Sequence, residues 1–179
     1  MKKKIAVGII VMLIVIGLSG CTQDTRLDHL GYANYQYGFG LNPPEGWTID
    51  ESGQNDDVVG FNGPTMEGDF AVLYISKPYD LIYGVTLFDV AEETIEYCNT
   101  NLSNFTLISK NNRTINGMNS YEIVYTMNIS FLPIKAKQVM VEMEGKYFYI
   151  TFTALSYAYD SYLPVIEQSI NSFTINIIM

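Results

Sequence analysis

The sequence predicts an α+β fold in which a mainly antiparallel β-sheet carries helices packed on it. After residue 100, segments of alternating apolar and polar residues follow one another, and Asn116-Gly117 joins two of them as in a tight β-hairpin. Residues 86–102 and 159–173 have the apolar spacing of amphipathic helices. The resulting order of strands, one helix, four strands and a second helix favours an antiparallel sheet with helices on it.

The first half of the chain predicts two strands separated by a turn. Residues 35–41 alternate aromatic and small side chains, which is typical of a half-buried strand. Residues 70–76 form a continuous apolar run, as expected of a strand that is covered on both faces. Between them, the two prolines and the glycine of residues 42–47 (NPPEGW) predict a turn.

Two helices and a second hairpin complete the predicted domain. Thr86 and Asp89 have the spacing of a capping box at the start of the first helix. Asp160 is the expected cap of the second helix, with Pro164 close to its first turn. A turn around Gly145 is expected to join the last two strands.

The N-terminus has the features of an export signal. Three lysines precede an uncharged apolar run over residues 5–18, which is shorter than the roughly 20 residues of a membrane span. The sequence Leu18-Ser19-Gly20-Cys21 then resembles the lipobox of prokaryotic lipoproteins. This resemblance implies cleavage between Gly20 and Cys21 and attachment of lipid to the Cys21 thiol. An uncleaved membrane anchor and an ordinary secreted protein are the alternatives.

These features divide the chain into three parts. We expect a lipoprotein signal peptide over residues 1–20, a lipidated tether over residues 21–34 and a single domain over residues 35–179. The mature protein would then be anchored by lipid to a cell membrane and face outside the cytoplasm.

The charge of the chain argues against several partners. It has 19 acidic and 10 Lys or Arg residues, which gives a formal net charge of −9, and three of the lysines lie in the signal peptide. A body this acidic repels phosphate backbones, so we expect no nucleic-acid binding. It also lacks the polybasic surface that would bind anionic lipid head groups.

Residues that carry common catalytic chemistry are scarce. His29 is the only histidine, and it lies in the expected tether. Once Cys21 carries lipid, Cys98 is the only thiol, and its place on the apolar face of the first helix predicts core packing. No nucleophile elbow, zinc-protease motif or phosphate loop occurs. The sequence therefore predicts no enzyme activity and no cofactor.

An acidic segment between residues 48 and 76 is a candidate cation site. It contains six carboxylates and no Lys or Arg before residue 76, and hard cations prefer converging carboxylate oxygens. The spacing of these acids fits no known ligand pattern, so a solvated loop and a catalytic carboxylate pair are the alternative interpretations. The four acids proposed as possible cation ligands are Asp56, Asp57, Glu67 and Asp69.

Two further residue types are candidates for surface roles. Several tyrosines could line a binding face or half-fill the core: Tyr32, Tyr35, Tyr37, Tyr79 and Tyr83. Four Asn-X-Ser/Thr sequences are possible glycosylation sites if the host has the machinery: Asn101, Asn104, Asn112 and Asn128.

The domain also resembles a known family. The segments LNPPEGW, VAEETIEYCNTNL, ING and YLPVIEQSINSF occur in an order and spacing similar to the PsbP-like family of extracytoplasmic proteins. This resemblance implies an α-β-α sandwich, often on secreted or lipid-anchored proteins, and plant members of the family assist photosystem II. It implies no shared active site.

Together these observations predict an envelope lipoprotein whose PsbP-like domain binds or supports a partner protein or complex without catalysis. The alternative is a lipoprotein that binds a small ligand or a divalent cation through the sheet face or the acidic loops.

Overall fold

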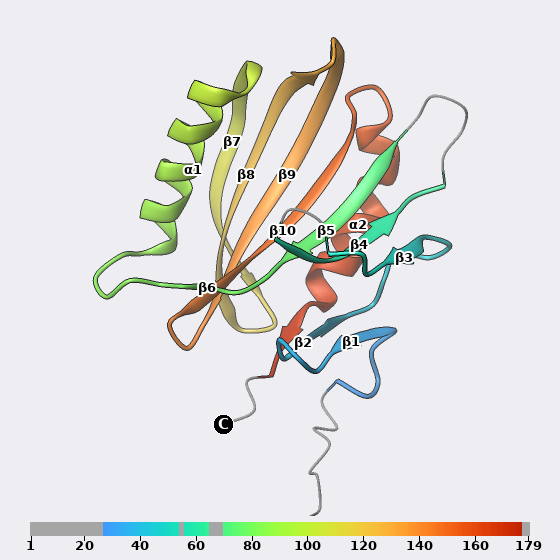
Figure 1. The fold of residues 1–179 in the computed structure, drawn as a ribbon, viewed down its shortest axis with the longest axis vertical. Helices are drawn as coiled ribbons and strands as arrows, with labels where there is room; N and C mark the ends of the chain where they lie inside the picture. Colours follow the sequence, from blue (N-terminus) through green and yellow to red (C-terminus); the bar gives the residue numbers. More distant parts are fainter. Residues whose placement is uncertain (1–26, 54–55, 65–69, 177–179) are drawn as a thin grey trace, which may run out of the picture.

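In the computed structural model of the chain, residues 27–53, 56–64 and 70–176 are described. Among them, an eight-stranded antiparallel sheet has the order β3-β4-β5-β10-β9-β8-β7, with β6 also paired to β10 (Figure 1). A small sheet of order β1-β2-β11 lies at one end. The bounds are β1 Tyr32–Asn34, β2 Phe39–Leu41, β3 Thr48–Asp50, β4 Asp57–Asn62, β5 Ala71–Ser76, β6 Tyr79–Asp80, α1 Leu87–Asn101, β7 Ser103–Ile115, β8 Met118–Ile129, β9 Leu132–Met143, β10 Lys146–Leu155, α2 Tyr159–Ser172 and β11 Thr174–Ile175.

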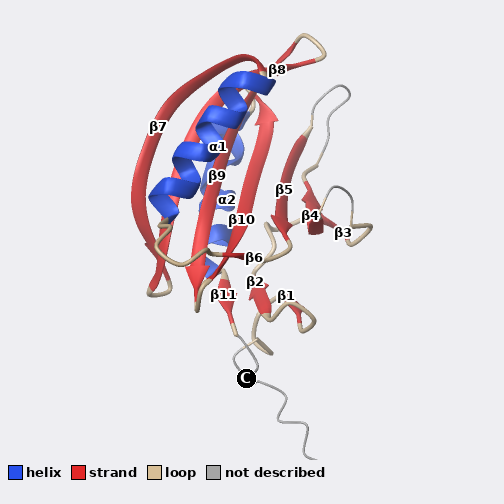
Figure 2. Ribbon diagram, turned by 60° about the vertical axis from the view of Figure 1, so that its left-hand side comes forward, coloured by secondary structure: helices blue, strands red, loops and turns tan. Residues whose placement is uncertain are grey.

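The two helices lie on opposite faces of the large sheet (Figure 2). Helix α1 packs on β7, β8 and β9, and α2 packs on the other face, against β10, β5, β7 and the small sheet. The predicted α+β class with a mainly antiparallel sheet is therefore confirmed, and the arrangement is the α-β-α sandwich that the resemblance implies.

Three turns join the four long strands β7 to β10, and the sequence predicts two of them. Asn116-Gly117 connects β7 to β8 and Glu144-Gly145 connects β9 to β10, both with positive φ. The β8–β9 turn is different, because Ser130 (φ 48°) and Phe131 (φ 72°) occupy the left-handed region without a glycine. A bulky residue rarely adopts this conformation.

The helix starts were predicted with mixed success. The capping box of α1 is confirmed: Thr86 Oγ1 accepts from the Asp89 backbone N–H at 3.3 Å, and the Thr86 N–H donates to Asp89 Oδ2 at 2.8 Å. The Asp160 cap of α2 was wrong, because the helix begins earlier, with Ala158 as its N-cap and no side-chain cap bond. Asp160 instead accepts from Lys135 Nζ at 2.9 Å.

The N-terminal part of the domain also differs from expectation. Only Phe39–Leu41 of the predicted strand over residues 35–41 is extended, because residues 35–38 form the turn between β1 and β2. The domain boundary expected at residue 35 lies earlier as well. Leu27 and Tyr32 are buried and Tyr32–Asn34 form β1, so part of the segment assigned to the tether packs with the folded part.

Each face of the large sheet has its own hydrophobic core. The α2 face is filled by large apolar side chains such as Phe39, Phe61, Phe152 and Phe173, all fully buried. The α1 face has a smaller core in which tyrosine makes up a larger share of the side chains. The odd-numbered residues of β10 point to this second face and the even-numbered ones to the first, as strand alternation requires.

A network of charged groups ties α2 to the sheet. Arg113 Nη1 donates to Glu122 Oε2 at 2.6 Å, and its Nη2 donates to Glu167 Oε2 at 3.1 Å. Lys137 Nζ lies 3.0 Å from Glu122 Oε2 and also donates to Glu167. Lys137 is only 7% exposed, so these two carboxylates compensate the cost of burying its charge.

Candidate functional site

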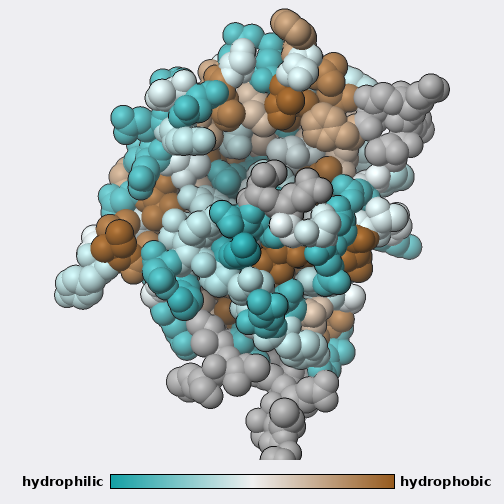
Figure 3. Space-filling view, viewed as in Figure 1, coloured by the Kyte–Doolittle hydropathy of each residue, from teal (hydrophilic) through white to brown (hydrophobic). Residues whose placement is uncertain are grey.

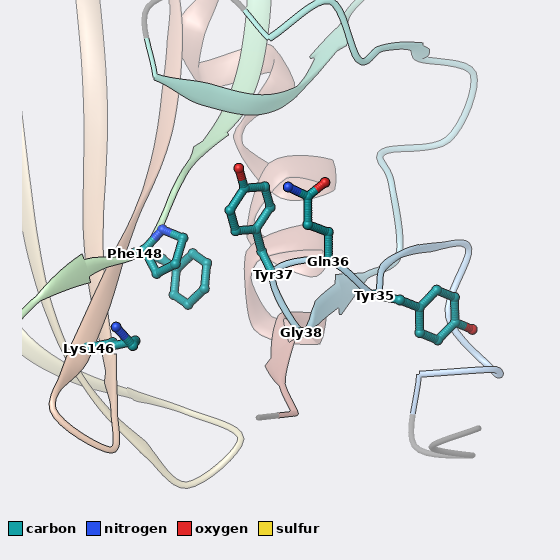
Figure 4. A pocket seen from close by; sticks show the side chains of 7 residues that line it. Tyr35, Gln36, Tyr37, Gly38, Lys146 and Phe148 are labelled. Carbon is teal, nitrogen blue, oxygen red and sulfur yellow. The ribbon is translucent and has the colours of Figure 1, made fainter. Parts of the chain in front are cut away.

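A shallow apolar pocket lies between the β1–β2 turn and the start of β10. Its volume is about 220 Å³, and Tyr37 and Phe148 are among its lining residues (Figure 4). Lys146 at the rim is paired with Asp80. Tyr35 also lines the pocket, and its hydroxyl donates to Asp28 Oδ1 at 2.8 Å. The volume is below the roughly 300 Å³ of ordinary ligand sites, so this pocket suits at most part of a ligand.

The candidate tyrosines do not share a single face. Tyr32 is buried and donates to Glu51 Oε1 at 2.8 Å, whereas Tyr83 is fully exposed on the loop before α1. Tyr79 stacks on Tyr147, with ring centroids 5.5 Å apart. Tyr147 in turn meets Tyr149 edge to face, and these two rings lie beside α1 on the second sheet face. Tyr147 and Tyr149 were not among the tyrosines predicted to line a binding face, although both lie in the predicted last strand.

An exposed apolar tip is formed by the β8–β9 hairpin, residues 129–132. Phe131 is 97% exposed, and Ile129 and Leu132 are each about half exposed. In Figure 3 apolar side chains gather at this end of the molecule. The tip lies at the opposite end from the small sheet and from the point where the chain enters the domain (Figure 1). Contiguous exposed apolar residues mark interaction surfaces more often than isolated ones do.

The acidic segment is split by the fold. Asp56 Oδ1 accepts from Lys77 Nζ at 3.1 Å on the surface. Burial, and next the charge of Asp56, raise the pKa of Asp57 to about 6. Glu67 and Asp69 lie outside the described residues. Within the part of the chain that the structure describes, no three His, Cys, Asp or Glu side chains gather closely enough to hold a metal ion.

The remaining candidate residues have simple surroundings. Cys98 is buried, and burial raises the pKa of its thiol, which keeps it protonated and unreactive. His29 is exposed in a turn. Three of the four candidate glycosylation asparagines, Asn101, Asn104 and Asn112, are exposed, and Asn128 is half-buried in β8.

The lipidation and cleavage residues, Cys21 and Gly20, lie outside the described residues, so these two expectations stay predictions. Among the helices of the described ranges, none is long and apolar enough to cross a membrane.

An antiparallel sheet with one helix on each face defines the structural class of the domain, an α-β-α sandwich, and this class does not by itself specify an activity. The family profile of PsbP-like proteins matches residues 16–175. The chain therefore belongs to the PsbP-like family.

Solved structures of low identity share the fold. The chain is similar to LpqN of Mycobacterium tuberculosis, which is involved in cell envelope biogenesis, with a TM-score of 0.61 and 14% identity over 78% of this chain and 83% of that one. It is similar to PA94 of Pseudomonas aeruginosa, a protein of unknown function, with a TM-score of 0.60 and 18% identity over 82% and 96%. Cyanobacterial PsbP (CyanoP) of Synechocystis sp. PCC 6803 gives a TM-score of 0.56 and 16% identity over 81% and 91%. No curated protein sequence matches the chain.

Proposed function

We propose that this protein is a lipoprotein of the cell envelope, anchored through Cys21, whose PsbP-like domain binds a partner protein and performs no catalysis. The lipobox-like residues 18–21 support the anchor. Family membership and the fold shared with LpqN, which is involved in cell envelope biogenesis, support the location.

The observation that carries the partner-binding role is the apolar tip, residues 129–132. Its turn holds Phe131 at φ 72°, where the two neighbouring hairpins have glycine. A non-glycine residue in such a conformation costs about 1–3 kcal/mol, and strain of this kind concentrates at functional sites. The side chain held there is 97% exposed, so the strain is not compensated by burial within the domain. Burial against a partner would supply that compensation.

The position of the tip fits the anchor. The chain enters the domain beside the small sheet, and the tip lies at the other end of the long strands (Figure 1). A domain tethered at Cys21 would therefore present the tip away from its lipid.

The anchor is tested by metabolic labelling with a fatty acid. We expect label and membrane association for the natural chain and neither for Cys21→Ser. An unlabelled natural chain, or a Cys21→Ser variant that stays in the membrane fraction, would contradict the anchor.

The partner role is tested by site-specific photo-crosslinking in the living host. A photoreactive residue at position 131 is expected to give a reproducible protein adduct, and one at Glu144, in the turn at the other end of the strands, is the matched control. Phe131→Asn keeps a residue that tolerates positive φ, so it should fold and still abolish co-purification of the adduct partner. Equal crosslinking from both positions, or none from 131, would contradict the role.

A further inference from the structure

A second cavity lies between α1 and the sheet, away from the apolar tip. Its volume is about 370 Å³, within the range of small-molecule sites. Helix α1 contributes Glu93 and Tyr97 to its wall, and the strands contribute Tyr125, Gln138, Tyr147 and Tyr149.

Gln138 is a polar interruption in an otherwise apolar row. On the α1 face of β9 it stands between Ala136 and Met140, both fully buried. Its Oε1 atom is buried and accepts no hydrogen bond within the described part of the chain. A buried acceptor without a donor is unfavourable, so its presence in a cavity wall points to a ligand that donates.

The hydroxyl of Tyr149 is also arranged as an acceptor. Thr94 Oγ1 lies 2.8 Å from the backbone oxygen of Val90 and 3.0 Å from Tyr149 Oη. A threonine hydroxyl has one proton, which here goes to Val90, so Tyr149 must donate its own proton to Thr94. The oxygen of Tyr149 then acts only as an acceptor, both for the Tyr147 hydroxyl, with which it shares a hydrogen bond, and for a ligand.

The charge around the cavity favours a cation. Glu93 is the only charged residue among those that line it, and the whole chain has a formal net charge of −9. The faces of tyrosine rings attract cations, and Tyr147 and Tyr149 meet edge to face with centroids 5.4 Å apart. An anion would find no compensating charge in this wall.

We propose that this cavity binds a small organic ammonium ion that has at least one N–H donor. Its N–H group donates to Gln138 Oε1, and its charge is balanced by Glu93 and the tyrosine rings. This site is independent of the lipid anchor and of the apolar tip, and it assigns to the protein a ligand as well as a partner.

The test is titration of the full chain, monitored by calorimetry at physiological salt, with three probes of matched shape: benzylammonium, benzyl alcohol and benzoate. We expect benzylammonium to bind at least about tenfold more tightly than the alcohol, and benzoate not to bind. Equal affinity for the ammonium and the alcohol, tighter binding of benzoate, or no heat from benzylammonium would overturn the proposal.

Two variants assign the contacts. Glu93→Gln should weaken benzylammonium binding at least about fivefold, while Glu96→Gln, on the same helix but outside the cavity, removes the same charge and should leave it unchanged. Gln138→Leu should weaken it by a similar factor. Both glutamate variants are at partly or fully exposed positions, so they are expected to fold. If the two glutamate variants weakened binding equally, the overall negative charge of the protein would be responsible and the assigned site would be overturned.

Discussion

The two faces of the large sheet are built differently although they share the same strands. The α2 face is closed by large apolar side chains and by a charged network that joins the helix to the sheet. The α1 face has a smaller core, a helix that packs on β7, β8 and β9, and a tyrosine-lined cavity beside it. More apolar side chains are therefore buried on the α2 face, whereas the α1 face keeps the cavity in which we propose that a ligand binds.

The largest expected effect comes from the α2 core. Phe152 is fully buried between Trp47 and Tyr159, with ring centroids 6.3 and 5.0 Å away. We expect Phe152→Ala to lower the free energy of unfolding by about 3–5 kcal/mol, because it leaves a cavity that cannot collapse. Tyr149→Ala, three positions earlier in β10 and on the opposite face of the sheet, should cost less than half as much. Urea denaturation measures both, and equal losses would remove the distinction between the faces.

The charged network is expected to be next in size. Burial alone would raise the pKa of Glu167, but the hydrogen bond and charge of Lys137, and the charge of Arg113, outweigh it and hold that pKa below its ordinary value. We expect Glu167→Gln to cost about 2–4 kcal/mol at neutral pH, because Lys137 loses a partner while buried.

The sign of the pH effect follows from the lowered pKa. The stabilisation by Glu167 is complete above the ordinary glutamate pKa of about 4.3 and is lost as the pH falls from there through the lower folded value. The difference between the natural chain and Glu167→Gln should therefore shrink on acidification. A difference that stays constant from pH 7 to pH 3 in denaturation curves would show that packing, and not charge, is responsible.

The sequence predicted those parts of the fold in which the determinants are local. The turn at Asn116-Gly117 and the capping box at Thr86 depend on neighbouring residues, and both were found. The β8–β9 turn was not predicted, because the pair Ser130-Phe131 contains no glycine, asparagine or proline and phenylalanine is not a turn residue. Strand β4 was not predicted, because the acidic residues of this segment favour a loop, and the pairing with β5 that makes it a strand is not visible in the sequence.

The candidate sites were predictable to a smaller extent. The cavity depends on Glu93, Gln138 and Tyr149, which come from three elements and meet only in the fold. The one local signal was Gln138 within an apolar row of alternating residues. The charged network is similar, since positions 113, 122, 137 and 167 are far apart in sequence.

The two helices also differ in how they begin. Helix α1 is held at its start by Thr86, whereas α2 has no side-chain cap and depends on the network. We expect Thr86→Ala to cost about 1 kcal/mol, the usual value for a lost N-cap. Asp160→Ala, which removes only an exposed pair with Lys135, should cost less than about 0.5 kcal/mol. Thermal denaturation followed by circular dichroism measures both, and a larger loss for Asp160→Ala would contradict the assignment of the caps.

The smallest expected effect has the opposite pH dependence to that of Glu167. The pKa of Asp57 is raised to about 6 by burial and by the charge of Asp56, so the folded state becomes less stable as the pH rises from the ordinary aspartate value of about 3.9 through 6. Asp57→Asn should therefore stabilise the protein at pH 7.5, by less than about 1 kcal/mol because water screens the half-exposed group, and should make little difference at pH 4.

Asp50→Asn is the control. A hydrogen bond from the Ser52 backbone lowers the pKa of Asp50, so removing the Asp50 charge should give no gain in stability at pH 7.5. If Asp57→Asn instead destabilises the protein at pH 7.5, the Asp57 carboxylate is stabilised in the fold, and the contrast between its charge and that of Glu167 disappears.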